Sequence, residues 1–289
     1  MAINNSGEIN NSAWGRSAAG LGGALLLVAL SGITLLAPVP KVLVISWVAF
    51  VAMVAGGFLG ARTRTTSPTR LVWGYGLASG AMVTSAAVFL LPQAIGLDPR
   101  VGGFGVAAGL LAGYGGHVVG HRLAHVDVGL EITAAQITAH ALSAGIIIGL
   151  VYGSMPALGL LLGLAIVSHK GPAGYAAANR LRRADKPISS LLLPAAGVGL
   201  TAIPAAMLPV PQVPVVSAAV FGFAAGVFLH VAMDFLPTCE VGGEVHDVCG
   251  LTEDSHALLD RLRIHAVAST VLGGFAVFVA WLAVGTTPV

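Results

Sequence analysis

Apolar residues run along this chain in long segments that short polar stretches separate. The segments lie at 17–37, 42–60, 71–93, 102–119, 131–153, 156–179, 187–208, 214–236 and 264–286. A helix needs about 20 apolar residues to cross a bilayer, and most of these segments approach that length. The pattern predicts an all-α, polytopic membrane helix bundle that forms one transmembrane domain over residues 17–289. Residues 1–16 are polar and Asn-rich, and we expect a flexible tail there.

Composition supports a membrane location. Only 9% of the 289 residues are charged and the mean hydropathy is +0.89, whereas soluble domains carry roughly 25% charged residues. The apolar core of a signal peptide is the alternative for segment 17–37, but such a core is normally about 7–15 residues long. We therefore expect a lipid bilayer as the surroundings and no nucleic-acid partner.

The placement of Lys and Arg predicts an orientation. If nine spans alternate from a cytoplasmic N-terminus, eleven of the 14 cations fall on the inside and two, Lys41 and Arg100, on the outside. Such an excess follows the positive-inside rule. The chain is then a multi-pass protein of the cell membrane with its C-terminus outside. The remaining cation, Lys170, lies within a span.

Ionisable residues inside the apolar segments are few, and they are the first candidates for function. They are His140, His169, Lys170, His230 and Asp234. Such residues are costly in a bilayer and often functional, although each could instead be a hydrogen-bonded packing group. Asp234 is the only carboxylate deep in a span, so we expect it to be the charge partner of Lys170.

The histidine-bearing segments carry further polar side chains at helical spacing. Residues three and four apart share a helix face, so His140 shares one with Gln136 and Ser143. In the next segment, Pro172 removes a backbone hydrogen bond and should loosen the helix close to His169. An ordinary proline kink is the alternative.

A second group of histidines lies on the predicted inner side. His117, His121 and His125 recur every four residues, which stacks them on one helical face suited to Zn²⁺. A solvated helix end is the alternative. Loop 237–262 combines Cys239, Cys249 and several acidic residues. Its spacing matches no standard zinc motif, so metal capture and an ordinary charged loop both remain open.

Motifs of several enzyme classes are absent. The chain has no His-Glu-x-x-His, no Gly-x-Ser-x-Gly and no phosphate-binding loop. We therefore expect no enzyme activity, no transport driven by ATP on this chain and no permanently bound cofactor.

Four motifs in order resemble the ZIP family of divalent-metal transporters. His140 and Gly145 match that family's His-Asn-x-x-Asp-Gly, and residues 169–174 match its His-Glu-x-Pro-Glu-Gly at the His, Pro and last Gly. Residues 76–94 resemble the second core helix of the family, and residues 222–237 its seventh. The resemblance covers about residues 60–286. It implies eight core transmembrane helices plus one extra N-terminal helix.

The departures from the family fall on the metal ligands. Ala141, Ala144, Lys170 and Ala173 stand where the family has Asn or acidic residues, so its carboxylate-bridged two-metal centre cannot form. His140, His169 and Met82 remain as transport-site ligands, with Ser143 and Gln136 as oxygen donors. The resemblance then places Lys170 where a second metal would lie, as a tethered cation.

The sequence thus predicts a ZIP-like transporter that moves a divalent metal into the cytoplasm. Imidazole and thioether ligands favour Zn²⁺, with Fe, Mn or Cd as alternatives. The alternatives for the function are a ZIP-fold regulator or receptor that has lost transport, and a transporter of another ion, such as an anion drawn to Lys170. We leave open whether the protein is a monomer or a homodimer.

Overall fold

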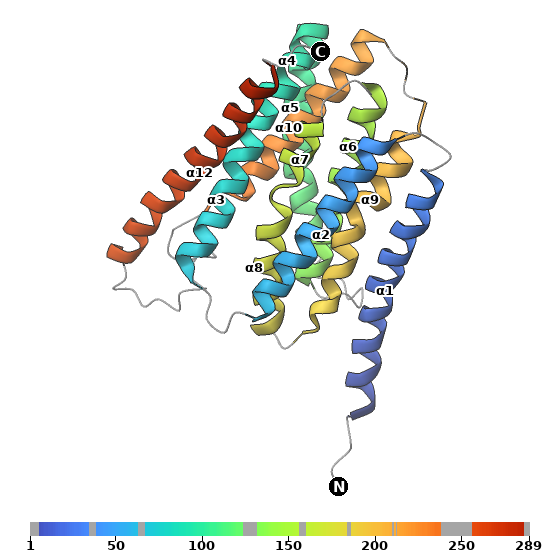
Figure 1. The fold of residues 1–289 in the computed structure, drawn as a ribbon, viewed down its shortest axis with the longest axis vertical. Helices are drawn as coiled ribbons and strands as arrows, with labels where there is room; N and C mark the ends of the chain where they lie inside the picture. Colours follow the sequence, from blue (N-terminus) through green and yellow to red (C-terminus); the bar gives the residue numbers. More distant parts are fainter. Residues whose placement is uncertain are drawn as a thin grey trace.

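The structure, a computed structural model, describes residues 6–34, 39–62, 67–123, 132–155, 160–183, 186–209, 211, 213–237 and 256–285. Over these ranges the chain is almost entirely helical and contains no strand. The helices pack side by side into one bundle (Figure 1). The predicted all-α class is confirmed.

Nine helical passes coincide with the nine apolar segments in the part of the chain that is described. Their bounds are α1 Ser6–Ile33; α2 Pro40–Arg62; α3 Pro68–Ser85 with η1 Ala86–Leu90 and α4 Leu91–Leu97; α5 Pro99–Leu123; α6 Ile132–Ser154; α7 Leu160–Val167 and α8 Lys170–Arg183; η2 Ile188–Leu191 and α9 Leu192–Ala206; α10 Pro214–Asp234; and α12 His256–Gly285. Six of the described helices are long and apolar enough to cross a membrane. The protein is therefore a multi-pass α-helical membrane bundle, whereas eight core spans plus one stays a prediction.

Two boundaries differ from the prediction. The first helix begins at Ser6, although we expected a flexible tail to residue 16. The third pass contains one π-helical turn, Ala86–Leu90, which ends two residues before Pro92. A proline at position 92 cannot donate to the carbonyl of Val88, and a wider turn accommodates the missing bond. The pattern of apolar residues along the sequence predicts neither the helix start at Ser6 nor the π-helical turn.

Successive passes run in opposite directions, so the two ends of the chain lie at opposite ends of the bundle. The first turn of α1 is at the bottom of Figure 1 and the last turn of α12 is at the top. An odd number of antiparallel passes produces this arrangement. It agrees with termini on opposite sides of a membrane, while the side on which each lies stays a prediction.

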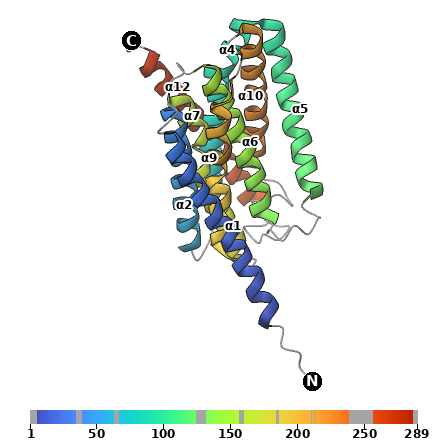
Figure 2. The same ribbon diagram turned by 90° about the vertical axis from the view of Figure 1, so that its right-hand side faces the viewer.

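The helices form two groups according to their most extensive contacts. We call α1, α2, α6, α7, α8 and α9 the histidine bundle, because α6 and the junction of α7 with α8 carry His140 and His169. We call α3, α4, α5, α10 and α12 the flanking bundle. Within the first group α6 packs on α9 and α2 on α8; within the second α5 packs on α10 and α3 on α12. Figure 2 shows α5 beside α10 at the edge of the molecule.

The largest apolar cluster joins the two bundles. It includes Leu27, Ile45, Ile148 and Ile203 from the histidine bundle and Phe221 from α10, and these five side chains are fully buried or nearly so. Close van der Waals packing of apolar side chains holds helices together in a bilayer, where lipid tails are as apolar as the helix surface. The candidate site lies where the same two groups of helices meet.

Candidate functional site

His140 and His169 lie face to face, although 29 positions separate them in the sequence. Their Nε2 atoms are 3.3 Å apart, and their rings meet edge to face at an angle of 63°. His140 is half-buried on α6, and His169 is only 1% exposed. At this distance one Nε2–H can donate to the lone pair of the other ring when the two tautomers differ.

The position of His169 follows from a break in its helix. α7 ends at Val167 and α8 begins at Lys170, so Ser168 and His169 lie between two helices. Pro172 has no N–H to donate to the carbonyl of Ser168 four residues earlier, and its ring crowds that carbonyl. We expected Pro172 to loosen the helix close to His169. In the structure the helix is fully interrupted, and His169 lies in the interruption.

Close backbone packing fixes this interruption against α2. A Cβ on Gly56 would collide with the backbone of Gly171, and one on Gly174 would collide with the carbonyl of Met53. Only glycine permits helices to approach so closely. The start of α8 is therefore held in place on α2, and His169 with it.

A similar contact fixes the helix that carries His140. The Thr201 hydroxyl on α9 donates to the carbonyl of Leu142 at 2.6 Å. A Cβ on Gly145 would collide with the side chain of Thr201 and the backbone of Val198. Because α6 and α9 touch through their backbones one turn after His140, the imidazole has a defined position.

Phe235 covers the histidine pair from the other bundle. This residue caps the end of α10, and its ring centroid lies 5.1 Å from that of His169 and 6.2 Å from that of His140. Tyr75 on α3 packs edge to face on Phe235 at 5.5 Å. Phe235 is not recognisable as a site residue from the sequence, because one more aromatic residue at the end of an apolar segment gives no signal.

Lys170 is buried beside the pair. It follows His169 directly, is 1% exposed, and its Nζ has no hydrogen-bond partner in the described part of the chain. A buried ammonium without a partner is costly, so Lys170 needs an explanation.

The expected pairing of Lys170 with Asp234 is not formed. Asp234 Oδ2 lies 3.3 Å from Nε2 of His230, one turn earlier on α10, and the Asp234 side chain is 42% exposed. Two residues four apart on one helix meet without any tertiary constraint, and this local pair replaces the expected one. That Asp234 is the only carboxylate deep in a predicted span therefore did not identify its partner.

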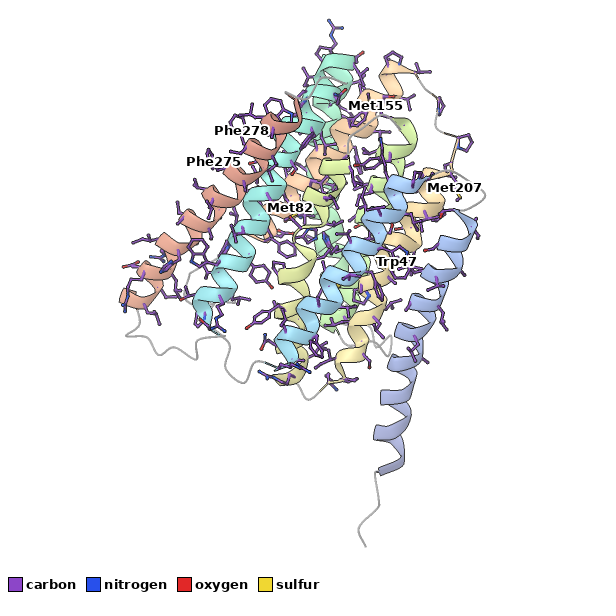
Figure 3. The ribbon with its side chains drawn as sticks, viewed as in Figure 1. Trp47, Met82, Met155, Met207, Phe275 and Phe278 are labelled. Carbon is purple, nitrogen blue, oxygen red and sulfur yellow. The ribbon has the colours of Figure 1, made fainter. Side chains whose placement is uncertain are left out.

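The other predicted ligands lie at different distances from the pair. Met82 is buried near the end of α3 (Figure 3), in a cluster with Val231 and Ala232 against which Phe235 packs. Ser143 is exposed, and its hydroxyl donates to the carbonyl of His140 within α6. The backbone of Gln136 belongs to α6, but its side chain lies outside the described part. Met82 is thus the third candidate that adjoins the same aromatic group.

The predicted inner-face site is outside what the structure describes. His117 and His121 are on the last turns of α5, but their side chains are not described, and His125 lies outside the described residues. The same holds for Cys239, Cys249 and the rest of the acidic loop up to residue 255. These ligands stay predictions.

The separation of the two imidazoles fits one tetrahedral metal ion. Zinc binds histidine nitrogens at about 2.0–2.1 Å, and two such ligands at a tetrahedral angle lie about 3.3 Å apart. The observed Nε2–Nε2 distance is 3.3 Å. No group of three or more His, Cys, Asp or Glu suited to a metal occurs among the described residues, so the pair would supply only two ligands.

Together these features define a class: a multi-pass α-helical membrane protein in which a buried histidine at a helix break meets a half-buried histidine of another helix, and an aromatic residue of a second bundle covers both. No family model matches the chain, and no curated protein matches it. The resemblance to ZIP transporters therefore stays a prediction from the four sequence motifs.

Proposed function

We propose that this protein is a ZIP-like transporter that moves a divalent metal ion, zinc above all, across the cell membrane into the cytoplasm. The observation that carries the proposal is the 3.3 Å separation of the His140 and His169 Nε2 atoms. Two neutral imidazoles at this spacing can bind one tetrahedral ion without any change in their distance. Iron, manganese and cadmium are the alternative cargoes.

The ligand set favours one weakly held ion. Thioether and imidazole suit Zn²⁺ better than Mg²⁺ or Ca²⁺, which prefer oxygen ligands. Met82 lies against Phe235, which also packs on both rings, so a movement of that aromatic ring would bring the thioether and the histidines into one space. Few ligands give a low affinity, and a transporter benefits from a site that also releases its ion.

A second candidate function has its own observation. Lys170 is buried without a hydrogen-bond partner in the described part of the chain, and an ammonium repels a divalent cation. This favours either a regulator or receptor that kept the fold and lost transport, or a transporter of another ion. Neither alternative predicts zinc movement that depends on both histidines.

Uptake of radioactive zinc by proteoliposomes tests the proposal. His140→Ala and His169→Ala should each abolish most uptake while the protein stays folded, since a site with two imidazoles cannot lose one. His265→Ala is the matched control, because this α12 histidine bonds to Trp73, away from the pair. Equal uptake by the wild type and both mutants would reject the assignment, and no uptake by the wild type would favour the regulator.

A further inference from the structure

Lys170 has no counter-charge among the carboxylates that the structure describes. Asp234 pairs with His230, Asp260 with Arg263, and Asp98 accepts hydrogen bonds from the first turn of α5. These three are the acidic residues whose side chains the structure describes; Glu8 also lies in the described ranges, on α1, but its side chain is not described. The Nζ atom of Lys170 is buried and has no hydrogen-bond partner in the described residues.

The helix break adds positive potential at the same place. α8 has 14 residues and begins at Lys170, so the N–H groups of Lys170 and Gly171 have no partner within α8. The first turn of a helix carries the positive end of its dipole and attracts anions. The residue that carries the buried ammonium is thus also the first residue of a helix, and both features favour a negative charge.

The opposite end of the break favours a cation. α7 ends at Val167, and the carbonyl groups of its last turn carry the negative end of the α7 dipole. His169 lies between the two helix ends and faces His140. In broken membrane helices, the two half-helix ends commonly contact ions of opposite sign. The geometry therefore suits a cation and an anion side by side.

Charge balance makes the anion necessary for metal binding. Two neutral imidazoles leave a divalent ion with its full charge, and the ammonium of Lys170 adds another. The described carboxylates are engaged elsewhere, and buried charges need partners. With two protein ligands from His140 and His169, a tetrahedral metal also has coordination positions left for an anion.

We propose that Lys170 and the first turn of α8 hold a small monovalent anion, which becomes a third ligand of the metal bound by His140 and His169. The anion is compact, of the kind represented by chloride and bicarbonate. It binds between the ammonium and the ion and neutralises part of the charge of both. The role as a metal ligand rests on the proposed zinc transport, whereas the anion site itself does not.

Crystals grown with bromide in place of chloride test the anion site directly. Anomalous scattering should place bromide at hydrogen-bond distance from Lys170 Nζ, with or without zinc. Lys170→Met keeps the side-chain volume and should lose that peak, while Lys186→Met, a change at an exposed lysine, should keep it. A protein carboxylate at Nζ, or a peak that persists in Lys170→Met, would overturn the proposal.

Zinc uptake at a fixed free zinc concentration tests the coupling. Proteoliposomes are compared in chloride, in bicarbonate and in gluconate, which is too large for the site. We expect at least about a tenfold loss in gluconate, because a hydrogen bond to a charged group is worth roughly ten- to a hundredfold in affinity. A response to chloride alone or to bicarbonate alone identifies which of the two is the native anion.

The mutants complete the design. Lys170→Met should be equally slow in all three media, and Lys186→Met should behave as the wild type. Wild-type uptake that is the same in the three media would overturn the metal–anion site while zinc transport stands. No uptake in any medium would instead count against the proposed function, and the bromide density then decides the anion site by itself.

Discussion

The packing inside each bundle differs from the packing between the two bundles. Inside the histidine bundle, α2 and α8 touch through the backbones of Gly56 and Gly171. Inside the flanking bundle, a Cβ on Gly80 would collide with the backbone of Thr270, and one on Gly109 with that of Phe223. Such contacts join helices of one bundle into a unit that cannot slide internally.

Between the bundles the contacts at the site are made by side chains. Phe235 packs on the rings of His140 and His169. Gly74 faces Pro172, and a Cβ added to Gly74 would lie 3.4 Å from the Cβ of Pro172, an ordinary van der Waals distance. Side chains can change rotamer and repack as two units shift, as in shear motions. The histidine pair is therefore built on one rigid unit and covered by the other, at the place where relative movement meets least resistance.

The largest effect is expected from adding bulk inside a bundle. Gly56→Val places side-chain atoms where the backbone of Gly171 lies, and since neither helix can yield we expect a loss of at least about 3 kcal/mol. The fraction of monodisperse protein in detergent and its melting temperature measure this. Gly103→Val on α5 is the control, because its Cβ meets nothing within 4 Å. Equal stability of the two mutants would remove the distinction between the bundles and the contact between them.

Much of this architecture could be predicted from the sequence. Nine apolar segments were visible because a helix that faces lipid on one side and helices on the other must be apolar nearly all round. The motif positions of His140 and His169 led to a pair that does meet. That the pair binds metal stays a prediction.

What could not be predicted depends on contacts between helices. The predicted pairing of Asp234 with Lys170 was wrong. A local i, i+4 contact with His230 competes with any distant partner, and the sequence does not show which of the two contacts is more favourable. The cover by Phe235 was missed, because it depends on where α10 ends relative to α6. The helix break lies at Ser168 and His169 rather than at Pro172 itself, since a proline affects the carbonyl four residues earlier.

A smaller effect on folding, with a clear effect on function, is expected at the contact between the bundles. Phe235→Ala removes the ring that covers both histidines, so their positions become less defined and uptake of zinc should fall several-fold. Phe235 is half-buried, and the loss of stability should remain below about 3 kcal/mol, the low end for a buried Phe→Ala change. Both zinc uptake and melting temperature are measured on the same preparation.

The control for this mutant is on the outer surface. Phe275 lies on the side of α12 that faces away from the other helices (Figure 3), and it is 60% exposed. Phe275→Ala should change neither uptake nor melting temperature by much. If Phe235→Ala also transports zinc at the wild-type rate, the aromatic cover has no part in positioning the pair.

Lys170→Glu tests how the charge at position 170, in the histidine bundle, affects zinc binding. It replaces the buried ammonium with a carboxylate beside His169, and unlike unit charges about 4 Å apart attract by roughly 4 kcal/mol at an effective dielectric near 20. We expect zinc to bind at least about tenfold more tightly, to leave more slowly, and to raise the melting temperature more than in the wild type. Zinc titration followed by thermal melting measures both, with Lys186→Glu as the control.

The outcome for Lys170→Glu also bears on the anion. A built-in carboxylate should make zinc uptake independent of chloride and bicarbonate, because the negative charge is then part of the protein. Zinc binding no tighter than in the wild type would mean that Lys170 does not adjoin the metal, and that its role is confined to packing or to the anion alone.

The smallest effect is expected at the end of the flanking bundle that is predicted to be cytoplasmic. His117 and His121 are on the last turns of α5 and His125 follows, beyond the described residues. Helix spacing stacks the first two on one face, but a helix end in water leaves a metal ion free to keep its hydration shell. Replacing all three by Ala should therefore reduce zinc uptake by no more than about threefold, which corresponds to less than 1 kcal/mol, or alter only its dependence on cytoplasmic zinc.

His265→Ala, on the same bundle, again serves as the control. Complete loss of uptake in a correctly folded triple mutant would place these imidazoles on the obligatory path.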